Sequence, residues 1–96
     1  MSAYFIVRCT YKSMDDYKNY AKHAGIAVNR FNGNFIIKGT EEQYQKETGT
    51  HQKTVVVEFN TILDAKSCYQ SDDYQKAIKF ILNSSSRDFI ITESLS

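Results

Sequence analysis

Hydrophobic and polar residues alternate in four short segments of the chain, which is the pattern of β-strands with one buried face. We expect these strands over residues 4–11, 34–39, 54–59 and 88–93, where β-branched and aromatic residues dominate. Alternation assigns one face of each strand to the core. The side chains expected on that face are Phe5, Val7, Cys9, Tyr11, Phe35, Ile37, Val55, Val57, Phe59, Phe89 and Ile91.

Two segments between these strands carry apolar residues at three- and four-residue spacing, which predicts amphipathic helices. Ser13 is the expected N-cap of a helix over residues 14–29. A second helical segment runs from Thr61 to about Asn83. Ser71 begins a new capping pattern inside it, so the segment is either one kinked helix or a short helix followed by a longer one.

The expected order of elements is β-α-β-β-α-β, which defines the split-βαβ or ferredoxin-like α+β fold. In that fold the four-stranded sheet is antiparallel, the strand order is 4-1-3-2, and right-handed crossovers place both helices on one face. An α+β sheet with another strand order is the alternative. The polar segment 41–53 is expected to connect the second and third strands, and residues 1–96 form one domain.

The face of the sheet that no helix covers is also apolar. It carries Tyr4, Ile6, Ile36, Val56 and Ile90, which would form an exposed patch of roughly several hundred Å², more than a soluble monomer usually tolerates. A second copy of the chain, packed sheet to sheet about a two-fold axis, is the simplest cover for this patch. We therefore expect a homodimer of the dimeric α/β-barrel type.

Three charged residues share that face with the apolar ones. Arg8, Glu58 and Lys38 are expected to run across the sheet as plus, minus, plus, with Glu58 in the middle. They form either an ion-pair ladder that fixes the dimer register or the polar lining of a pocket within the barrel. Because charges are costly to bury unpaired, Glu58 should lie within salt-bridge distance of a basic neighbour in its own subunit or the partner.

The composition excludes several classes of function. The 96 residues carry 12 Lys and Arg against 11 Asp and Glu, so the net charge of +1 provides no footprint for nucleic acid or an anionic membrane. No apolar run can span a bilayer, and the N-terminus has no signal-peptide pattern. The two cysteines, Cys9 and Cys68, are too few for a disulfide framework. Buried free thiols favour a cytoplasmic location.

Few residues have the types and spacing that chemistry requires. His51 lies in the polar connection and is the better of two histidines as a general base, although a surface histidine is the simpler interpretation. Tyr69, Ser71 and Tyr74 gather hydroxyls around the helix break, either as a cap with core tyrosines or as the wall of a small-ligand cleft. No metal-ligand spacing, phosphate loop or dinucleotide fingerprint occurs, so no metal or cofactor is expected.

Several motifs resemble the domain of unknown function 1330 family of the dimeric α/β-barrel superfamily. Residues 65–75 are similar to its pattern A-x-x-W-Y-x-S-x-E-Y-Q, although Cys68 stands where the family usually has tryptophan. Residues 30–35 resemble its aromatic-Gly-Gly-x-aliphatic turn, and residues 57–59 its strand ending in E-F-P. The resemblance implies the fold and the dimer but no reaction. Related members of the superfamily include cofactor-free monooxygenases, isomerases and haem enzymes.

The sequence thus predicts a small protein that binds or turns over an organic molecule in a cleft. The alternative is a non-catalytic assembly or binding module whose interface charges are structural. An enzyme would need a titratable group in a pocket, for which the candidates are Glu58, Arg8 and His51. The candidate ligand-binding residues are Tyr4, Lys38, Tyr69, Ser71 and Tyr74.

Overall fold

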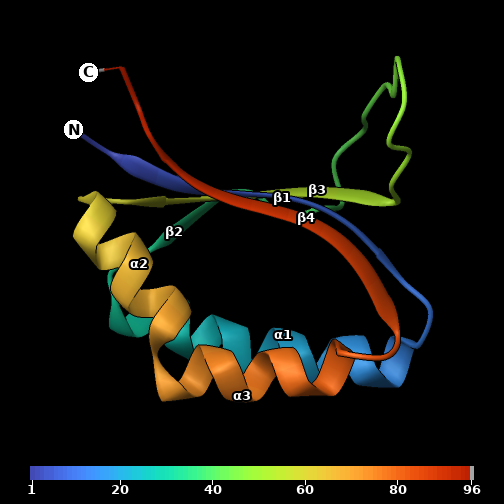
Figure 1. Ribbon diagram of the computed structural model, residues 1–96, viewed down its shortest axis with the longest axis horizontal. Helices are drawn as coiled ribbons and strands as arrows, with labels where there is room; N and C mark the ends of the chain where they lie inside the picture. The colour runs from blue at the N-terminus through green and yellow to red at the C-terminus, as the bar shows by residue number, and fades with distance from the viewer. Residues whose placement is uncertain (96) are drawn as a thin grey trace.

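The computed structural model describes residues 1–95 and confirms the β-α-β-β-α-β order (Figure 1). The helical segment after the third strand is two separate helices. The elements are β1 (Ala3–Tyr11), α1 (Met14–Arg30), β2 (Asn34–Ile37), β3 (Lys53–Phe59), α2 (Ile62–Gln70), α3 (Asp72–Ile81) and β4 (Ser85–Glu93).

The four strands form one antiparallel sheet in the order β2-β3-β1-β4, which is the expected 4-1-3-2 order numbered from the opposite edge. The central strand β1 pairs with β3 on one side and with β4 on the other, so Phe5 lies between Val57 and Ile91. All three helices lie on the same side of this sheet (Figure 1). The long connection between β2 and β3 rises from the other side.

Ser71 separates α2 from α3 by capping both of them. Its backbone N–H donates to the Cys68 carbonyl, which ends α2, and its hydroxyl oxygen accepts the Tyr74 N–H at 3.2 Å, which begins α3. Helix α3 therefore starts at Asp72 in a new direction. Tyr74 lies in the first turn of α3 and faces the core, with 1% of its surface exposed. The break is what places this tyrosine under the sheet.

The core consists of aromatic rings from the sheet packed against small residues from the helices. Phe5 is central, with its ring centroid 4.7 Å from that of Phe59 and 4.9 Å from that of Phe89. Ala27 on α1 and Ala77 on α3 are fully buried, and their short side chains allow the helices to approach each other. Burial of large aromatic rings provides most of the hydrophobic stabilisation in a chain of this size.

A β-bulge in β2 overturns the alternation that the sequence predicts there. Phe35 pairs with Val57, but Ile37 pairs with Val56, so one extra residue lies between them. Because a shift of one residue exchanges the two faces of a strand, Ile37 lies with Val56 on the uncovered face and Lys38 turns toward the helices. The expected positions of Ile37 on the core face and Lys38 on the opposite face are therefore wrong.

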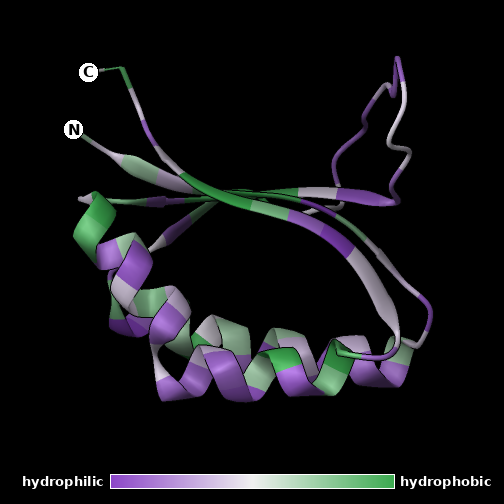
Figure 2. Cartoon of the chain, in the orientation of Figure 1, coloured by the Kyte–Doolittle hydropathy of each residue, from purple (hydrophilic) through white to green (hydrophobic). Residues whose placement is uncertain are grey.

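The uncovered face of the sheet is apolar at its centre, as expected. Ile6 and Val56 are half-buried neighbours on paired strands, Ile90 is 55% exposed, and Ile36 at the bulge is 49% exposed. Figure 2 shows that the strands remain hydrophobic where they run side by side, while hydrophilic residues are concentrated on the helices and the long connection. No described helix covers these side chains.

Two glycines offer a matched test of the packing between α1 and β3. A Cβ atom on Gly33 would lie 2.7 Å from Val28 and 2.8 Å from Phe59, whereas one on Gly25 would have no neighbour within 4 Å. We expect Gly33→Ala to lower the free energy of unfolding by about 1–3 kcal/mol because it overpacks the core. Gly25→Ala, inside α1, should instead raise it by roughly 0.5–1 kcal/mol. Urea denaturation of both variants measures the difference, and equal effects would contradict the packing described here.

Candidate ligand-binding cavity

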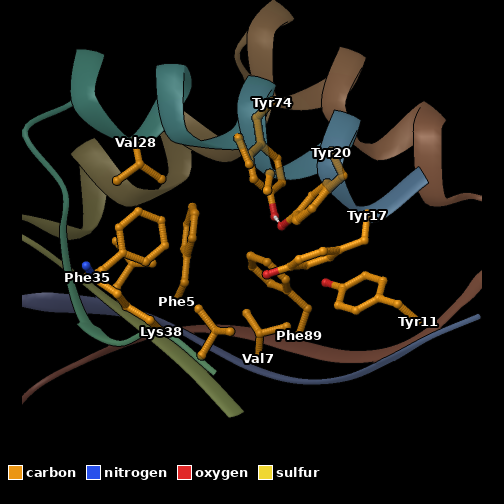
Figure 3. A pocket seen from close by; sticks show the side chains of 14 residues that line it. Phe5, Val7, Tyr11, Tyr17, Tyr20, Val28, Phe35, Lys38, Tyr74 and Phe89 are labelled. Carbon is orange, nitrogen blue, oxygen red and sulfur yellow. Dashed lines mark hydrogen bonds between the residues drawn. The ribbon is translucent and has the colours of Figure 1, made fainter. Parts of the chain in front are cut away.

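A cavity of about 290 Å³ lies between the sheet and helix α1 (Figure 3). Most of its wall is apolar. The lining residues are Phe5, Val7, Tyr11, Tyr17, Tyr20, Ala21, Ala24, Val28, Phe35, Lys38, Val55, Val57, Tyr74 and Phe89.

The cavity exists because large and small residues follow one another along α1. Tyr17 and Tyr20 extend from the first half of the helix toward the sheet, and Ala21 and Ala24 stand one turn further along the same side. The methyl groups of the two alanines do not reach the strands, so the space beneath them stays open. Residues three and four apart lie on one face of a helix, which aligns these side chains over the sheet.

Four tyrosine side chains converge at one end of the cavity (Figure 3). The Tyr20 and Tyr74 hydroxyl oxygens are 2.8 Å apart, and Arg87 Nη2 donates to the Tyr74 oxygen at 3.0 Å. The Tyr11 and Tyr17 rings pack together with centroids 4.6 Å apart. The Arg87 guanidinium also lies 5.0 Å from the centroid of the Tyr20 ring, a cation–π arrangement.

Burial keeps these phenols protonated. It raises the pKa of Tyr11 and of Tyr74, with the neighbouring Tyr20 adding to the effect in both cases, and it raises the pKa of Tyr17. Burial acts to lower the pKa of Arg87, but the oxygens of Tyr20, Tyr74 and Tyr11 outweigh it and the pKa is raised. At neutral pH Tyr11, Tyr17 and Tyr74 are therefore neutral phenols beside one charged guanidinium.

Lys38 lies at the end of the cavity opposite the tyrosines, beside Phe35 (Figure 3), whereas Lys53 lies near the tyrosine end. Lys38 lines the cavity, and the Lys53 ammonium nitrogen lies 5.5 Å from the centroid of the Tyr17 ring. Within residues 1–95 the Lys38 ammonium group has no hydrogen-bond or ion-pair partner. The cavity therefore combines apolar walls with unneutralised positive charge at its rim.

The structure distributes the expected ligand-binding residues over three places. Tyr74 and Lys38 line the cavity. Tyr69 packs its ring against Phe5, Phe89 and Tyr74 and is a core residue, and Ser71 acts as a helix cap. Tyr4 lies on the uncovered face, where its hydroxyl donates to Glu58 Oε2 at 3.2 Å. The helix break thus contributes to the cavity through Tyr74 rather than through a cleft of its own.

The expected row of Arg8, Glu58 and Lys38 does not form within the chain. Arg8 stands opposite Thr54, four residues along β3 from Glu58, a separation of roughly 13 Å. The bulge turns Lys38 to the other face. Within the described chain Glu58 therefore pairs with Tyr4, and Arg8 Nη2 donates to Gln45 Oε1 at 2.8 Å. Glu58 therefore forms no ion pair within the described chain, and an ion pair with the partner subunit stays a prediction.

His51 is buried rather than exposed, which corrects the interpretation of it as a surface histidine. Only 9% of its surface is accessible, because the connection between β2 and β3 folds back against the sheet. Its Nδ1 atom is 3.2 Å from Thr10 Oγ1, and its Nε2 atom is 3.1 Å from Asp88 Oδ2. The imidazole therefore ties the end of the connection to β1 and β4, and its use as a general base stays a prediction.

A second groove adjoins this connection and differs in character from the cavity. It has a volume of about 310 Å³ and is lined by Arg8, Thr54 and residues 43–49. Its walls are polar, and the imidazole of His51 is not among them. Within residues 1–95, no three His, Cys, Asp or Glu residues are grouped so as to hold a metal ion, and no helix is long and apolar enough to cross a membrane.

The residues that sequence reasoning missed are those that define the polar end of the cavity. In the sequence, the three-residue spacing of Tyr17 and Tyr20 indicates only the apolar stripe of a helix, and the alternation in residues 4–11 places Tyr11 only on the core face of β1. Arg87 lies outside the strand expected over residues 88–93, because β4 begins at Ser85. The alternation of Arg87, Phe89 and Ile91 was the available signal, since it places the guanidinium on the face that the helices cover.

Comparison with protein families finds a match to one family model. The model is the domain of unknown function DUF1330, and it matches residues 2–95. Comparison with the curated proteins finds no significant match.

Several solved structures share the fold at low sequence identity. A protein of unknown function from Rhodopseudomonas palustris superposes with a TM-score of 0.77 at 13% identity, covering 99% of this chain and 83% of that one. SnoaB, a cofactor-independent oxygenase from Streptomyces nogalater, gives 0.64 at 8% identity over 99% and 94% of the two chains. A dimeric ferredoxin-like protein of unknown function from Thermobifida fusca gives 0.57 at 11% identity over 98% and 92%. At these identities the likeness shows the ferredoxin-like fold.

Because the Tyr74 hydroxyl is hydrogen-bonded, we expect its removal to destabilise the folded protein. Tyr74→Phe leaves Arg87 Nη2 without its acceptor and should lower the free energy of unfolding by about 1–3 kcal/mol. Tyr44→Phe is the matched control, since Tyr44 is 78% exposed on the long connection and its loss of a hydroxyl should be nearly neutral. Chemical denaturation of both variants provides the comparison. If the two substitutions changed the free energy of unfolding equally, the hydrogen bonds among Arg87, Tyr74 and Tyr20 would contribute nothing to stability.

The cysteines should be inert in the folded protein. Cys9 and Cys68 are both fully buried, and burial raises the pKa of Cys68 to about 12. At pH 8 only about one Cys68 thiol in ten thousand is then ionised, and the thiolate is the reactive form. We expect iodoacetamide to modify neither residue under native conditions and both in guanidinium chloride, as measured by mass spectrometry. Rapid native alkylation of Cys68 would contradict the packing around α2.

Proposed function

The chain belongs to the DUF1330 family, and from this premise we propose that it is a homodimer that binds a small, flat, apolar molecule in the cavity beneath the sheet. The cavity is the observation that carries the proposal. Protein interiors are normally packed so densely that few voids exceed a water molecule. A space of about 290 Å³ walled by aromatic and aliphatic side chains is close to the size of small-ligand pockets.

The shape of the cavity favours planar ligands. Aromatic rings from both layers form its walls, with Phe5 and Phe89 on the sheet and Tyr17 and Tyr20 on α1 (Figure 3). Aromatic side chains stack against flat apolar groups and provide large contact areas at low entropic cost. A fused-ring compound with one polar substituent satisfies both the apolar walls and the hydroxyl groups at one end.

The uncovered face of the sheet supports the dimer. Ile6, Val56 and Ile90 form an apolar surface that a second copy would bury, and structural neighbours from Thermobifida fusca and Bacteroides fragilis are described as dimeric. Packing sheet against sheet would close a barrel in which the long connection after β2 reaches toward the partner. Arg8 and Glu58 then lie at the interface, where they set the register of the two subunits.

The proposal covers binding and assigns no reaction. One neighbour is described as a cofactor-independent oxygenase and another as a putative antibiotic biosynthesis monooxygenase, but at 8% and 12% identity they support the fold alone. Glu58, Arg8 and His51 all lie on the side of the sheet away from the cavity or at its edge. They are therefore not candidates for chemistry on a ligand held beneath the sheet.

Ligand binding is tested with a neutral probe of suitable shape, 2-naphthylmethanol, titrated into the ¹⁵N-labelled protein. We expect shifts of the amide signals from the residues that line the cavity, with saturation. Val55→Phe and Ala24→Leu fill the cavity from opposite walls and should abolish the response while the proteins stay folded. Ile26→Phe, on the exposed side of α1, is the control that should bind normally. Binding that survives both cavity-filling variants would overturn the proposal.

The dimer is tested by placing a charge on the apolar face. Ile6→Lys or Val56→Asp should convert the dimer to monomers or cause aggregation, because the charge would be buried without a partner. Ile90→Lys is a milder variant at a position that is 55% exposed in one chain, and Ile26→Lys on α1 is the control. Sedimentation velocity measures the outcome. A folded wild-type monomer at micromolar concentration would contradict the assignment.

A further inference from the structure

We propose that the cavity selects ligands that present an anionic oxygen, such as a carboxylate, phenolate or enolate, on a flat apolar body. This inference rests on the proposed function, since it names the class of ligand for the same cavity. The observation behind it is a chain of hydrogen bonds from Arg87 through Tyr74 to Tyr20, which fixes where each proton lies.

The direction of this chain follows from the donors that are available. Arg87 can only donate, so the Tyr74 oxygen accepts its N–H at 3.0 Å. Tyr74 is 1% exposed, and its own hydroxyl hydrogen needs an acceptor, because an unsatisfied buried donor is strongly unfavourable. Within residues 1–95 the Tyr20 oxygen at 2.8 Å is the acceptor within reach. Tyr74 therefore donates to Tyr20.

The Tyr20 hydrogen is then left without an acceptor in the described chain. Tyr20 lines the cavity, and its hydroxyl stands where the tyrosine side chains converge (Figure 3). A guanidinium at the start of a hydrogen-bond chain polarises each donor that follows, which makes the last one stronger. The Tyr20 hydroxyl is thus a reinforced donor directed at whatever occupies the cavity, and an oxygen with negative charge is its best partner.

The charges around the cavity also favour an anionic ligand. Its lining contains no carboxylate, and Lys38 contributes an ammonium group without a partner in the described chain. Glu41 is the acidic residue nearest to Lys38 in sequence. One of its oxygens accepts the backbone N–H groups of Lys38, Gly39 and Thr40 at 2.9–3.1 Å, which holds its carboxylate on the backbone of the turn. An incoming anion therefore meets uncompensated positive charge.

A cationic ligand would have to use the faces of the aromatic rings, and three of these rings already have a cation against them. Arg87 lies 5.0 Å from the Tyr20 centroid and 5.1 Å from the Phe89 centroid, and Lys53 lies 5.5 Å from that of Tyr17. A further cation would compete with the protein's own side chains and be repelled by them. The raised pKa of Tyr11, Tyr17 and Tyr74 keeps these three phenols neutral, so none of them attracts a cation as a tyrosinate.

Three probes of the same shape and different charge test the inference at pH 7: 2-naphthoate, 2-naphthylmethanol and 2-naphthylmethylammonium. Their dissociation constants are measured by NMR titration of the wild-type protein. We expect 2-naphthoate to bind at least about tenfold more tightly than the ammonium probe, because a hydrogen bond to a charged oxygen is stronger than a neutral one. The alcohol should lie between them.

Two variants separate the contributions to this preference. Tyr20→Phe should weaken 2-naphthoate by about tenfold and leave the ammonium probe unchanged, and Lys38→Met should weaken 2-naphthoate by a smaller factor that decreases with added salt. Tyr44→Phe, which removes a hydroxyl from the exposed connection, is the matched control and should change nothing. Lys38 is exposed, so its variant tests the inference even if Tyr20→Phe destabilises the fold.

The outcomes distinguish the two proposals. If none of the three probes binds in the cavity, the proposed function and this inference both fail. If the probes bind with equal affinity, or the ammonium probe binds most tightly, the cavity binds ligands but the charge preference is wrong. If 2-naphthoate is preferred but neither variant changes its affinity, the preference arises elsewhere and the assignment to Tyr20 and Lys38 is wrong.

Discussion

Burial of the Tyr74 hydroxyl requires hydrogen-bond partners, and those partners organise the centre of the molecule. The Ser71 cap starts α3 so that Tyr74 faces the sheet, and the ring packs against Phe5 at 5.8 Å between centroids. The hydroxyl then needs both a donor and an acceptor. Arg87 from β4 and Tyr20 from α1 provide them, so one side chain links both crossover units of the fold.

The sizes of the side chains along α1 determine where a space remains between this helix and the sheet. Tyr17 and Tyr20 extend to the sheet and hold the first half of α1 away from it, because a phenol ring is far longer than an alanine side chain. Ala21 and Ala24 follow on the same face and leave the space unfilled. In the last turns of α1, Ala27 and Val28 are buried against the core, and Val28 also lines the cavity. The cavity is therefore a consequence of residue size along a single helix.

Most of the fold could be predicted because it depends on periodic burial. The alternation in residues 4–11 and the helical spacing in 14–29 reflect one-sided packing, which the structure confirms within one or two residues. The order of elements then restricts the topology to a few arrangements. The Ser71 capping pattern also indicated the helix break, because a cap is a local interaction between neighbouring residues.

The errors concern features that depend on contacts between distant segments. The bulge between Phe35 and Ile37 exchanges the faces of the residues after it, and nothing in the local sequence requires an extra residue there. His51 is buried because a polar connection folds back onto β1 and β4, which its composition does not reveal. A cleft is predicted by the sequence, but its position under α1 is not, since an apolar stripe with two tyrosines is equally compatible with a filled core.

The cavity and the uncovered apolar face lie on opposite sides of strand β1, and this gives the proposed assembly a physical rationale. Phe5 and Val7 point toward the cavity, while Tyr4 and Ile6 alternate with them on the uncovered face. A strand with an unfilled space on one side and solvent on the other is supported mainly by its two neighbours in the sheet. A partner packed on the outer face would hold β1 in position, so that the inner wall keeps its shape when the cavity is empty. In the proposed dimer, the apolar outer face would thus support the shape of the cavity as well as the assembly.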